Sequence, residues 1–238
     1  MPAMTGLPDM TIGLQGLRAC RLFAGVADEQ LETLARSMRA RRFRDGETIF
    51  HQDDPADALH VVATGAVNIV LPSAEEGEPA ILATLGPGEF FGALALLDDA
   101  PRSATAVALK GTQTFVLGRD VFLALIDEDR SLRRALLSSL AFEIRSITKH
   151  VHDLHFLDLP ARLTRRILRE SEARAPGPDG SIRLAWPYTQ AELAGMIGGS
   201  RQSVNRLLAD LGARGLIRME RDVLVIPDRL ALERSIRR

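Results

Sequence analysis

Residues 189–208, TQAELAGMIGGSRQSVNRLL, have the pattern of two short helices joined by a glycine turn. Thr189 can cap the first helix, with Glu192 three residues later as its capping-box partner. Ser200 can cap the second helix, because it follows the turn residues Gly198-Gly199 directly. The stretch therefore predicts a helix-turn-helix.

The second predicted helix has one apolar and one polar face. Its apolar stripe, at positions i, i+3, i+4 and i+7, consists of Val204, Leu207, Leu208 and Leu211. The opposite face carries residue types that read base edges in the major groove: Arg201, Gln202, Asn205 and Arg206. Each good bidentate pair to guanine or adenine is worth about 1–3 kcal/mol of discrimination. We predict sequence-specific binding to double-stranded DNA; the alternative is a helical hairpin whose polar residues have no such role.

A β-hairpin is predicted after these helices. The runs Leu216–Arg218 and Val223–Ile226 flank the polar residues 219–222. Beside a helix-turn-helix, such a hairpin forms a wing, and Arg218 is placed to contact phosphate. The predicted DNA contacts are therefore Thr189, Ser200, Arg201, Gln202, Asn205, Arg206 and Arg218.

The charge of the chain is divided unevenly along its length. Up to Phe156 there are 15 Lys and Arg against 21 Asp and Glu, and from Leu157 onward there are 15 Arg against 10 Asp and Glu. A basic C-terminal module suits a phosphate backbone. No apolar run is long enough for a membrane span, and the first residues lack a basic patch and an apolar core, so we expect a soluble cytoplasmic protein with no membrane partner. The single cysteine, Cys20, excludes an internal disulfide and is expected to be a buried thiol.

The N-terminal half predicts a β-rich domain after a short amphipathic helix, Asp28–Met38. Turn residues, including Gly65 and Gly111, separate short runs rich in Val, Ile, Thr and Phe. The predicted strands are Thr48–Phe50, Leu59–Ala63, Val67–Leu71, Ile81–Leu85, Ala104–Leu109 and Thr112–Leu117. Many short strands with glycine turns indicate a sandwich or small barrel.

A long helix is predicted from about Asp129. Its apolar residues follow the spacing 3, 4, 3, 4, 3 and form a heptad seam: Leu137, Leu140, Ile144, Ile147, Val151 and Leu154. The seam is narrow and bordered by charged residues, which favours a parallel homodimer over a helix packed on its own domain. Because Pro160 breaks the register after Phe156, we expect a hinge there. The expected domains are 1–128 (sensor), 129–156 (dimerisation helix) and 157–238 (DNA binding).

The helix-turn-helix, the preceding Phe156–Leu159 and the wing resemble the catabolite activator protein and fumarate–nitrate regulator (CRP/FNR) superfamily. The resemblance covers nearly the whole chain. It implies an α+β fold: an N-terminal β-roll (jelly-roll) domain of the cyclic-nucleotide-binding type, a long dimerisation helix and a C-terminal winged helix-turn-helix. Gln202 stands where the family has glutamate, and glutamine offers both a donor and an acceptor, so the usual operator of the family cannot be carried over.

The segments Phe91–Leu97 and Pro101–Thr105 resemble the phosphate-binding cassette of cyclic-nucleotide-binding domains. The resemblance implies that Arg102 and Ser103 hold a cyclic phosphate, with backbone groups of Gly92 and Leu94. Ala93 departs from the family, whose glutamate grips the ribose 2′-hydroxyl. By the same resemblance, the family's adenine-contacting pair of hydroxyl residues on the dimer helix aligns with Ile147 and Thr148, so only Thr148 keeps a polar group. A cyclic nucleotide resembling cyclic AMP is one candidate effector; another effector, or none, is the alternative.

The remaining motifs predict neither a metal site nor catalysis. Three of the five histidines, His150, His152 and His155, lie near the end of the dimer helix without the i, i+4 spacing of a metal pair. No nucleophile, base and orienting acid come together, so an enzyme is not expected. The predicted partners are an inverted-repeat DNA operator, a second copy of the chain and, by resemblance, RNA polymerase. The alternative in another class is a nucleotide-sensing subunit that regulates a protein partner.

Overall fold

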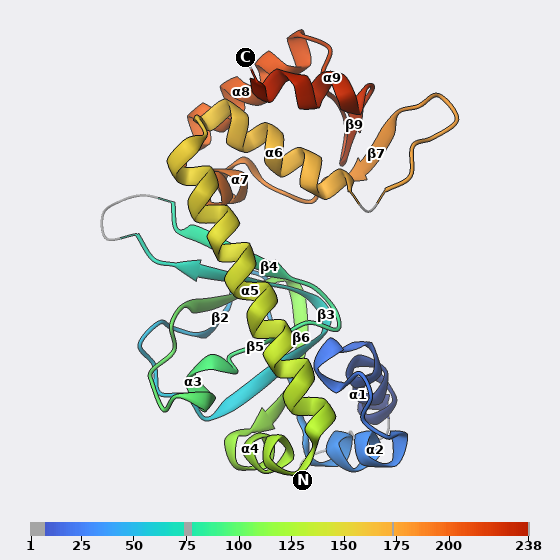
Figure 1. The fold of residues 1–238 in the computed structure, drawn as a ribbon, viewed down its shortest axis with the longest axis vertical. Coiled ribbons are helices and arrows are strands. Elements are labelled where there is room, and N and C mark those ends of the chain that lie inside the picture. The colour runs from blue at the N-terminus through green and yellow to red at the C-terminus, as the bar shows by residue number, and fades with distance from the viewer. Residues whose placement is uncertain (1–7, 74–77, 173, 238) are drawn as a thin grey trace. The chain divides into compact units, whose positions relative to one another are not determined.

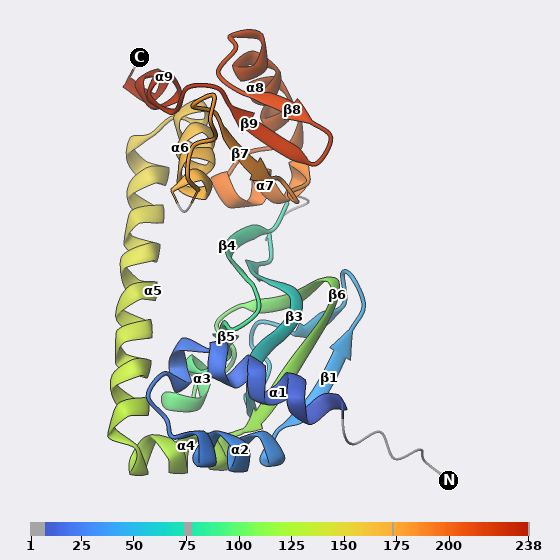
Figure 2. The ribbon, with the colours of Figure 1, turned by 90° about the vertical axis from the view of Figure 1, so that its right-hand side faces the viewer.

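The computed structural model describes residues 8–73, 78–172 and 174–237 (Figures 1 and 2). The chain divides into two compact units, one formed by residues 1–71 and 81–146 and the other by residues 72–80 and 147–238. In the described ranges no helix is long and apolar enough to cross a membrane.

The first unit is built on an antiparallel sheet in the order β1-β6-β3-β4, with β2 paired to β6 and β5 paired to β3. Its strands are β1 (Arg39–Phe43), β2 (Thr48–Phe50), β3 (Ala58–Leu71), β4 (Ala80–Leu85), β5 (Phe90–Phe91) and β6 (Thr105–Gly118). This β-rich domain is the one predicted from the sequence, although β1 lies before the first predicted strand, Thr48–Phe50, and is not predicted.

The division into four short strands around Gly65 and Gly111 is wrong. Residues 58–71 and 105–118 each form one continuous strand, and the two strands pair along their length. The register shifts between Val62 and Ala66, where Gly65 has a φ of 78° and Thr112 Oγ1 donates to the Ala66 carbonyl at 2.6 Å. Gly65 therefore lies at a bulge within a strand and not in a turn between strands. A Cβ at this position would lie 2.5 Å from Thr112 Oγ1.

Helices close the core of the first unit. They are α1 (Pro8–Ala19), the short helix η1 (Arg21–Phe23), α2 (Asp28–Ser37), α3 (Leu94–Leu97) and α4 (Arg119–Glu128). Figure 2 shows α1 lying beside the strands, where Leu17 is fully buried. The sequence analysis does not predict this helix, since its first predicted element begins at Asp28. Cys20 is buried, as predicted, and burial raises the pKa of its thiol to about 11.

The predicted long helix is α5 (Arg130–Phe156). Its first turns contribute Leu132 and Leu136 to the core of the first unit, and Leu140 packs partly buried against that core. The other residues of the seam are exposed in the single chain: Leu137 (66%), Ile144 (65%), Ile147 (55%), Val151 (49%) and Leu154 (40%). These side chains form an exposed apolar line on α5, the kind of surface that marks an interaction site.

The second unit contains the predicted winged helix-turn-helix. Its elements after α5 are α6 (Leu159–Ser171), β7 (Ile182–Ala185), α7 (Gln190–Ile197), α8 (Arg201–Ala213), β8 (Arg218–Glu220), β9 (Val223–Ile226), α9 (Arg229–Arg234) and η2 (Ser235–Arg237). The strands pair in the order β7-β9-β8. Strand β8 begins at Arg218 and not at Leu216, because Gly215 is left-handed and the Leu216 amide closes α8 on the Leu211 carbonyl at 3.0 Å.

Candidate DNA-reading and effector sites

The two helices of the helix-turn-helix begin at the predicted caps. Thr189 Oγ1 accepts from the Glu192 amide at 3.2 Å, and Glu192 Oε2 accepts from the Thr189 amide at 2.7 Å, which completes the capping box. Ser200 Oγ accepts from the Ser203 amide at 3.2 Å and so caps α8. Each helix therefore begins at a cap that is formed with a residue three positions later in the chain. The contact of Thr189 and Ser200 with DNA stays a prediction.

Steric contacts require glycine at both positions of the turn between the helices. Gly198 is left-handed, with a φ of 65°, and a Cβ there would lie 3.1 Å from Leu154 Cδ2. A Cβ on Gly199 would lie 2.8 Å from Leu159 Cδ1. Side chains from α5 and α6 therefore occupy the space beside the turn, and only glycine fits at both positions without a shift.

The reading face of α8 presents unpaired polar groups. Arg201, Gln202, Asn205 and Arg206 are all exposed, and within the described ranges none of their side chains makes a hydrogen bond or ion pair. Arg218, at the start of the wing, is exposed and unpaired in the same sense.

The arginines of α6 are paired instead. Arg165 and Arg169 bind the carboxylate of Asp153, and Arg162 donates to the Ile197 carbonyl at 2.6 Å. Arg166 pairs with Glu170 at 2.5 Å and lies over the ring of Tyr188. The basic charge of this unit is thus divided into arginines that support the fold and arginines that are free to meet a ligand.

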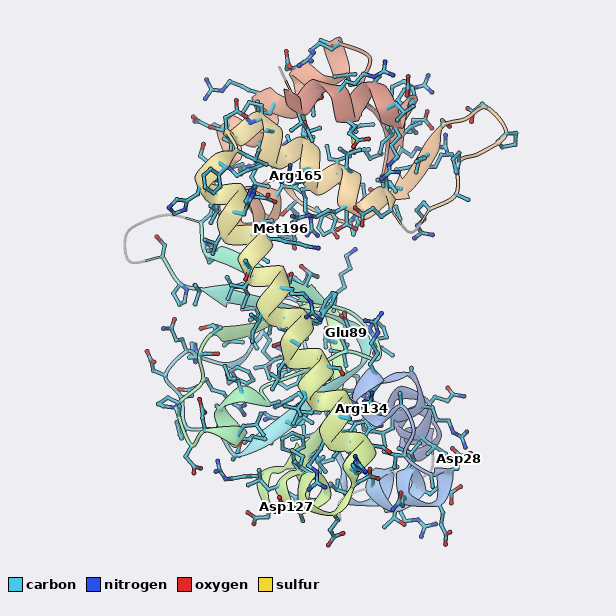
Figure 3. All side chains as sticks on the ribbon, viewed as in Figure 1. Asp28, Glu89, Asp127, Arg134, Arg165 and Met196 are labelled. Atoms are coloured by element: carbon cyan, nitrogen blue, oxygen red, sulfur yellow. The ribbon has the colours of Figure 1, made fainter. Side chains whose placement is uncertain are left out.

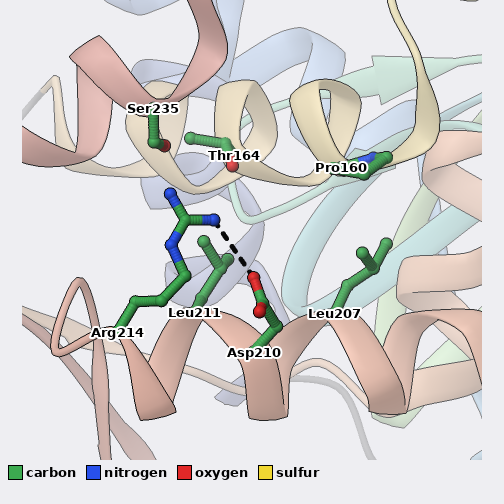
Figure 4. Close-up of a pocket in the computed structure, with 7 residues that line it drawn as sticks. All are labelled: Pro160, Thr164, Leu207, Asp210, Leu211, Arg214 and Ser235. Carbon is green, nitrogen blue, oxygen red and sulfur yellow. Dashed lines mark hydrogen bonds and ion pairs between the residues drawn. The ribbon is translucent and has the colours of Figure 1, made fainter. Parts of the chain in front are cut away.

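A small hollow lies beside the C-terminal half of α8 (Figure 4). Its lining residues are Pro160, Thr164, Leu207, Asp210, Leu211, Arg214 and Ser235. The two charged groups in it, Asp210 and Arg214, neutralise each other at 3.1 Å. The reading residues lie in the other half of the helix, so the hollow is not part of the DNA-reading site.

The cassette of the first unit is organised around Arg102, which is 3% exposed. Its Nη1 donates to the Gly92 carbonyl and its Nη2 to the Ala58 carbonyl, both at 2.7 Å. Gly92 has a φ of 83°, and a Cβ there would lie 2.5 Å from Arg102 Nη1. The structure therefore brings Gly92 and Arg102 together, as the sequence predicts, while the buried Nε of Arg102 has no partner among the described residues.

Aromatic residues that the sequence analysis missed surround this guanidinium. Arg102 lies over the ring of Phe50 at 4.3 Å, and His60 stacks on Phe91 with ring centroids 5.0 Å apart. His60 Nδ1 lies 3.1 Å from Thr114 Oγ1. Burial, aided by the positive charge of Arg102, lowers the pKa of His60 to about 3, so this ring is neutral at pH 7. No spacing rule in the sequence connects these residues.

The other predicted effector residues differ in how far they are exposed. Leu94 is 49% exposed, and Ser103 is exposed next to Arg102. Ala93 is 5% exposed and packs into the apolar core of the first unit. Thr148 lies on α5 in the second unit, so its position beside the cassette stays a prediction.

Comparison with known proteins identifies the chain. Residues 40–129 match the cyclic nucleotide-binding domain family, and residues 161–235 match the Crp-like helix-turn-helix domain family. A CRP-like cAMP-activated global transcriptional regulator of Mycobacterium tuberculosis is 30% identical over 216 residues, which cover 91% of this chain and 96% of the relative. The chain belongs to the CRP/FNR superfamily of transcription regulators. The function predicted from the sequence, a DNA-binding regulator with a sensor domain of the cyclic-nucleotide type, is confirmed at this level.

A second relative and a solved structure are also similar to the chain. The cyclic AMP receptor protein of Thermus thermophilus is 32% identical over 217 residues, covering 91% of this chain and 97% of the relative. The structure of FixK2 from Bradyrhizobium japonicum superposes with a TM-score of 0.71 at 23% identity, over 83% of this chain and 96% of that chain. This second likeness concerns the fold alone.

The three histidines near the end of α5 differ in exposure. His152 and His155 are exposed, but His150 is half-buried, and burial together with Arg169 lowers its pKa. In the part of the chain that the structure describes, no three His, Cys, Asp or Glu residues form a group that could hold a metal ion.

The burial of Ala93 leads to a prediction about the sensor of this CRP/FNR chain. Ala93→Glu places a carboxylate in the apolar core, and an unpaired buried polar group costs about 1–3 kcal/mol, more if charged. We expect the midpoint of thermal unfolding to fall by several degrees without ligand. If the ribose 2′-hydroxyl of cyclic AMP pairs with this carboxylate, the nucleotide should raise the midpoint of Ala93→Glu more than that of the parent.

Ala95→Glu is the matched control, because Ala95 is also buried, at 3% exposure, and lies two residues away. It should be destabilised in the same way without a specific recovery on adding cyclic AMP. Scanning calorimetry of the three chains with and without the nucleotide makes the comparison. Equal ligand shifts in all three would show that position 93 does not face a ribose.

Proposed function

We propose that the chain acts as a homodimer that binds an inverted-repeat operator through α8 and the wing. The observation that carries this proposal is the row of exposed, unpaired groups on α8, Arg201, Gln202, Asn205 and Arg206, beside an α6 whose arginines are all paired. The exposed seam on α5 supports the second copy.

DNA selection and footprinting test this proposal. Two-fold symmetry places the recognition helices about 34 Å apart, so we expect sequences selected from random DNA to form an inverted repeat with half-sites one helical turn apart. The affinity for the selected operator should fall steeply with salt, because arginine contacts release counterions from the duplex. A footprint of one unrepeated half-site, or an affinity that does not depend on salt, would count against the dimeric arrangement.

The proposed effector is a phosphate-bearing cyclic nucleotide, with cyclic AMP the first to test. The Mycobacterium tuberculosis relative, described as cAMP-activated, and the cyclic AMP receptor protein of Thermus thermophilus support this choice. The buried and unpartnered Nε of Arg102 suits an anion, whereas Ala93 offers no group to a ribose hydroxyl. We therefore expect weaker binding than in relatives that have glutamate at this position.

Arg102→Ala separates the two sites of the proposed function. It should leave the preferred operator unchanged and abolish the response to an anionic effector, because linkage requires the effector to prefer one state of the dimer. Calorimetric titration with cyclic AMP and operator binding with and without the nucleotide give the two readouts. If the parent binds no nucleotide, the regulator uses another effector or none.

The remaining parts of the proposal follow the superfamily. RNA polymerase is the proposed protein partner, the proposed location is the cytoplasm, and no catalytic role is proposed. The Mycobacterium tuberculosis relative is a transcriptional regulator, which does not favour a sensing subunit that acts on a protein alone.

A further inference from the structure

The end of α5 is tied to α6 by a buried carboxylate. Asp153 is 6% exposed, and its two oxygens bind different arginines. Asp153 Oδ1 accepts from Arg165 Nη1 at 2.5 Å, and Oδ2 accepts from Arg169 Nη2 at 2.7 Å. Because these arginines are four residues apart, the carboxylate bridges one turn along a single face of α6 (Arg165 is labelled in Figure 3).

The start of α6 contacts the turn of the helix-turn-helix. The side chain of Leu159 fills the space beside Gly199, and Arg162 donates to the last carbonyl of α7, that of Ile197. Leu154 of α5 lies beside Gly198 in the same turn. The last turns of α5, the helix α6 and the turn before α8 are thus connected by packing and by charged hydrogen bonds.

Asp153 lies away from the seam on α5. With Val151 and Leu154 at positions a and d of the heptad, Asp153 falls at position c, on the outer side of a coiled coil. A second copy along the seam would therefore leave both ion pairs in place. The carboxylate serves contacts within its own chain.

We propose that Asp153 is a positioning residue for DNA binding. It holds α6, and with it α8, in a fixed orientation relative to the end of α5. The proposal rests on the proposed function, because a fixed orientation of α8 is needed only if two reading helices must bind two half-sites at one spacing. A buried ion pair is weak evidence for stability, since desolvation offsets its attraction. The property to test is the effect of Asp153 on the orientation of α8.

The test compares two operators that differ only in spacing: the operator selected from random DNA, and the same half-sites with two extra central base pairs. The wild-type chain should prefer the selected spacing. Asp153→Asn should lower this preference about tenfold, a coupling of ordinary size, because loosened reading helices tolerate the altered spacing. Asp153→Glu, which keeps the carboxylate, should recover part of the preference. Fluorescence anisotropy of labelled operators gives the affinities.

Asp210→Asn is the matched control. It removes a carboxylate from an exposed ion pair with Arg214 in the same unit and should leave the spacing preference unchanged. Fluorescence of Trp186, the single tryptophan, which is buried in this unit, reports whether each variant folds. A merely destabilising change lowers the affinity for both operators equally and leaves their ratio unchanged.

The outcomes that overturn the proposal can be distinguished from one another. A wild-type chain without any spacing preference refutes the dimeric reading itself, and the role of Asp153 with it. A wild-type preference that Asp153→Asn retains in full refutes only the role of Asp153. Should that variant fail to fold, Arg169→Gln, which keeps the pair with Arg165, should show a smaller loss of the same ratio, and an unchanged ratio there overturns the proposal.

Discussion

A chain with Ile144 and Val151 both replaced by lysine should sediment as a monomer and lose its operator affinity. These side chains are 65% and 49% exposed in the single chain and lie on one line of the heptad seam. Four lysines per dimer would face one another in an apolar contact, and burying unpaired charges is strongly unfavourable. Because two linked reading heads gain about 10²–10⁴ in avidity, the operator affinity should fall by a factor in that range.

Ser138→Lys combined with Ser146→Lys is the control for added charge. Both serines are exposed on α5 and fall at the outer positions b and c of the same heptad. This variant should remain a dimer and keep its affinity for the operator. A seam variant that still sediments as a dimer would show that the two copies associate through another surface.

Arg206→Ala should cost about 1–3 kcal/mol at the operator and relax the preference at one base position, as direct readout requires. Arg206 is exposed and unpaired within the described ranges, so its removal disturbs no contact of the fold there. Nonspecific binding should change much less. Competition with operators substituted one base pair at a time measures both effects.

Arg214→Ala on the same helix removes an equal charge from the other half of α8, where Arg214 pairs with Asp210. It should leave the base preference unchanged. If Arg206→Ala weakens all sequences to the same degree, Arg206 contacts phosphate and the base-reading role must lie with its neighbours.

The parts of the site that the sequence predicts well are those set by neighbours along the chain. The capping box at Thr189, the cap at Ser200 and the left-handed Gly198 involve contacts within a few residues, so residue type and spacing are sufficient. The contact of these elements with DNA stays a prediction.

The parts that escape prediction depend on residues far apart in the chain. Arg102 reaches the Ala58 carbonyl 44 residues away, and Asp153 meets Arg165 and Arg169 across a helix junction. A heptad pattern identifies an apolar face but not what covers it, and Leu140 packs partly on the core of its own domain. A glycine between two runs of strand-forming residues occurs both in turns and in bulges, so the sequence around Gly65 predicts a turn where the structure has a bulge.

The burial of Cys20 makes the chain suited to chemical cross-linking. Its thiol is 1% exposed with a raised pKa, and it is the only cysteine, so thiol reagents and mild oxidants meet no reactive native group. A cysteine introduced at Ile147, on the exposed seam, would therefore be the only thiol available to form a disulfide between two copies. Such a covalent dimer would bind its operator independently of protein dilution, so the contribution of subunit association could be separated from that of base recognition.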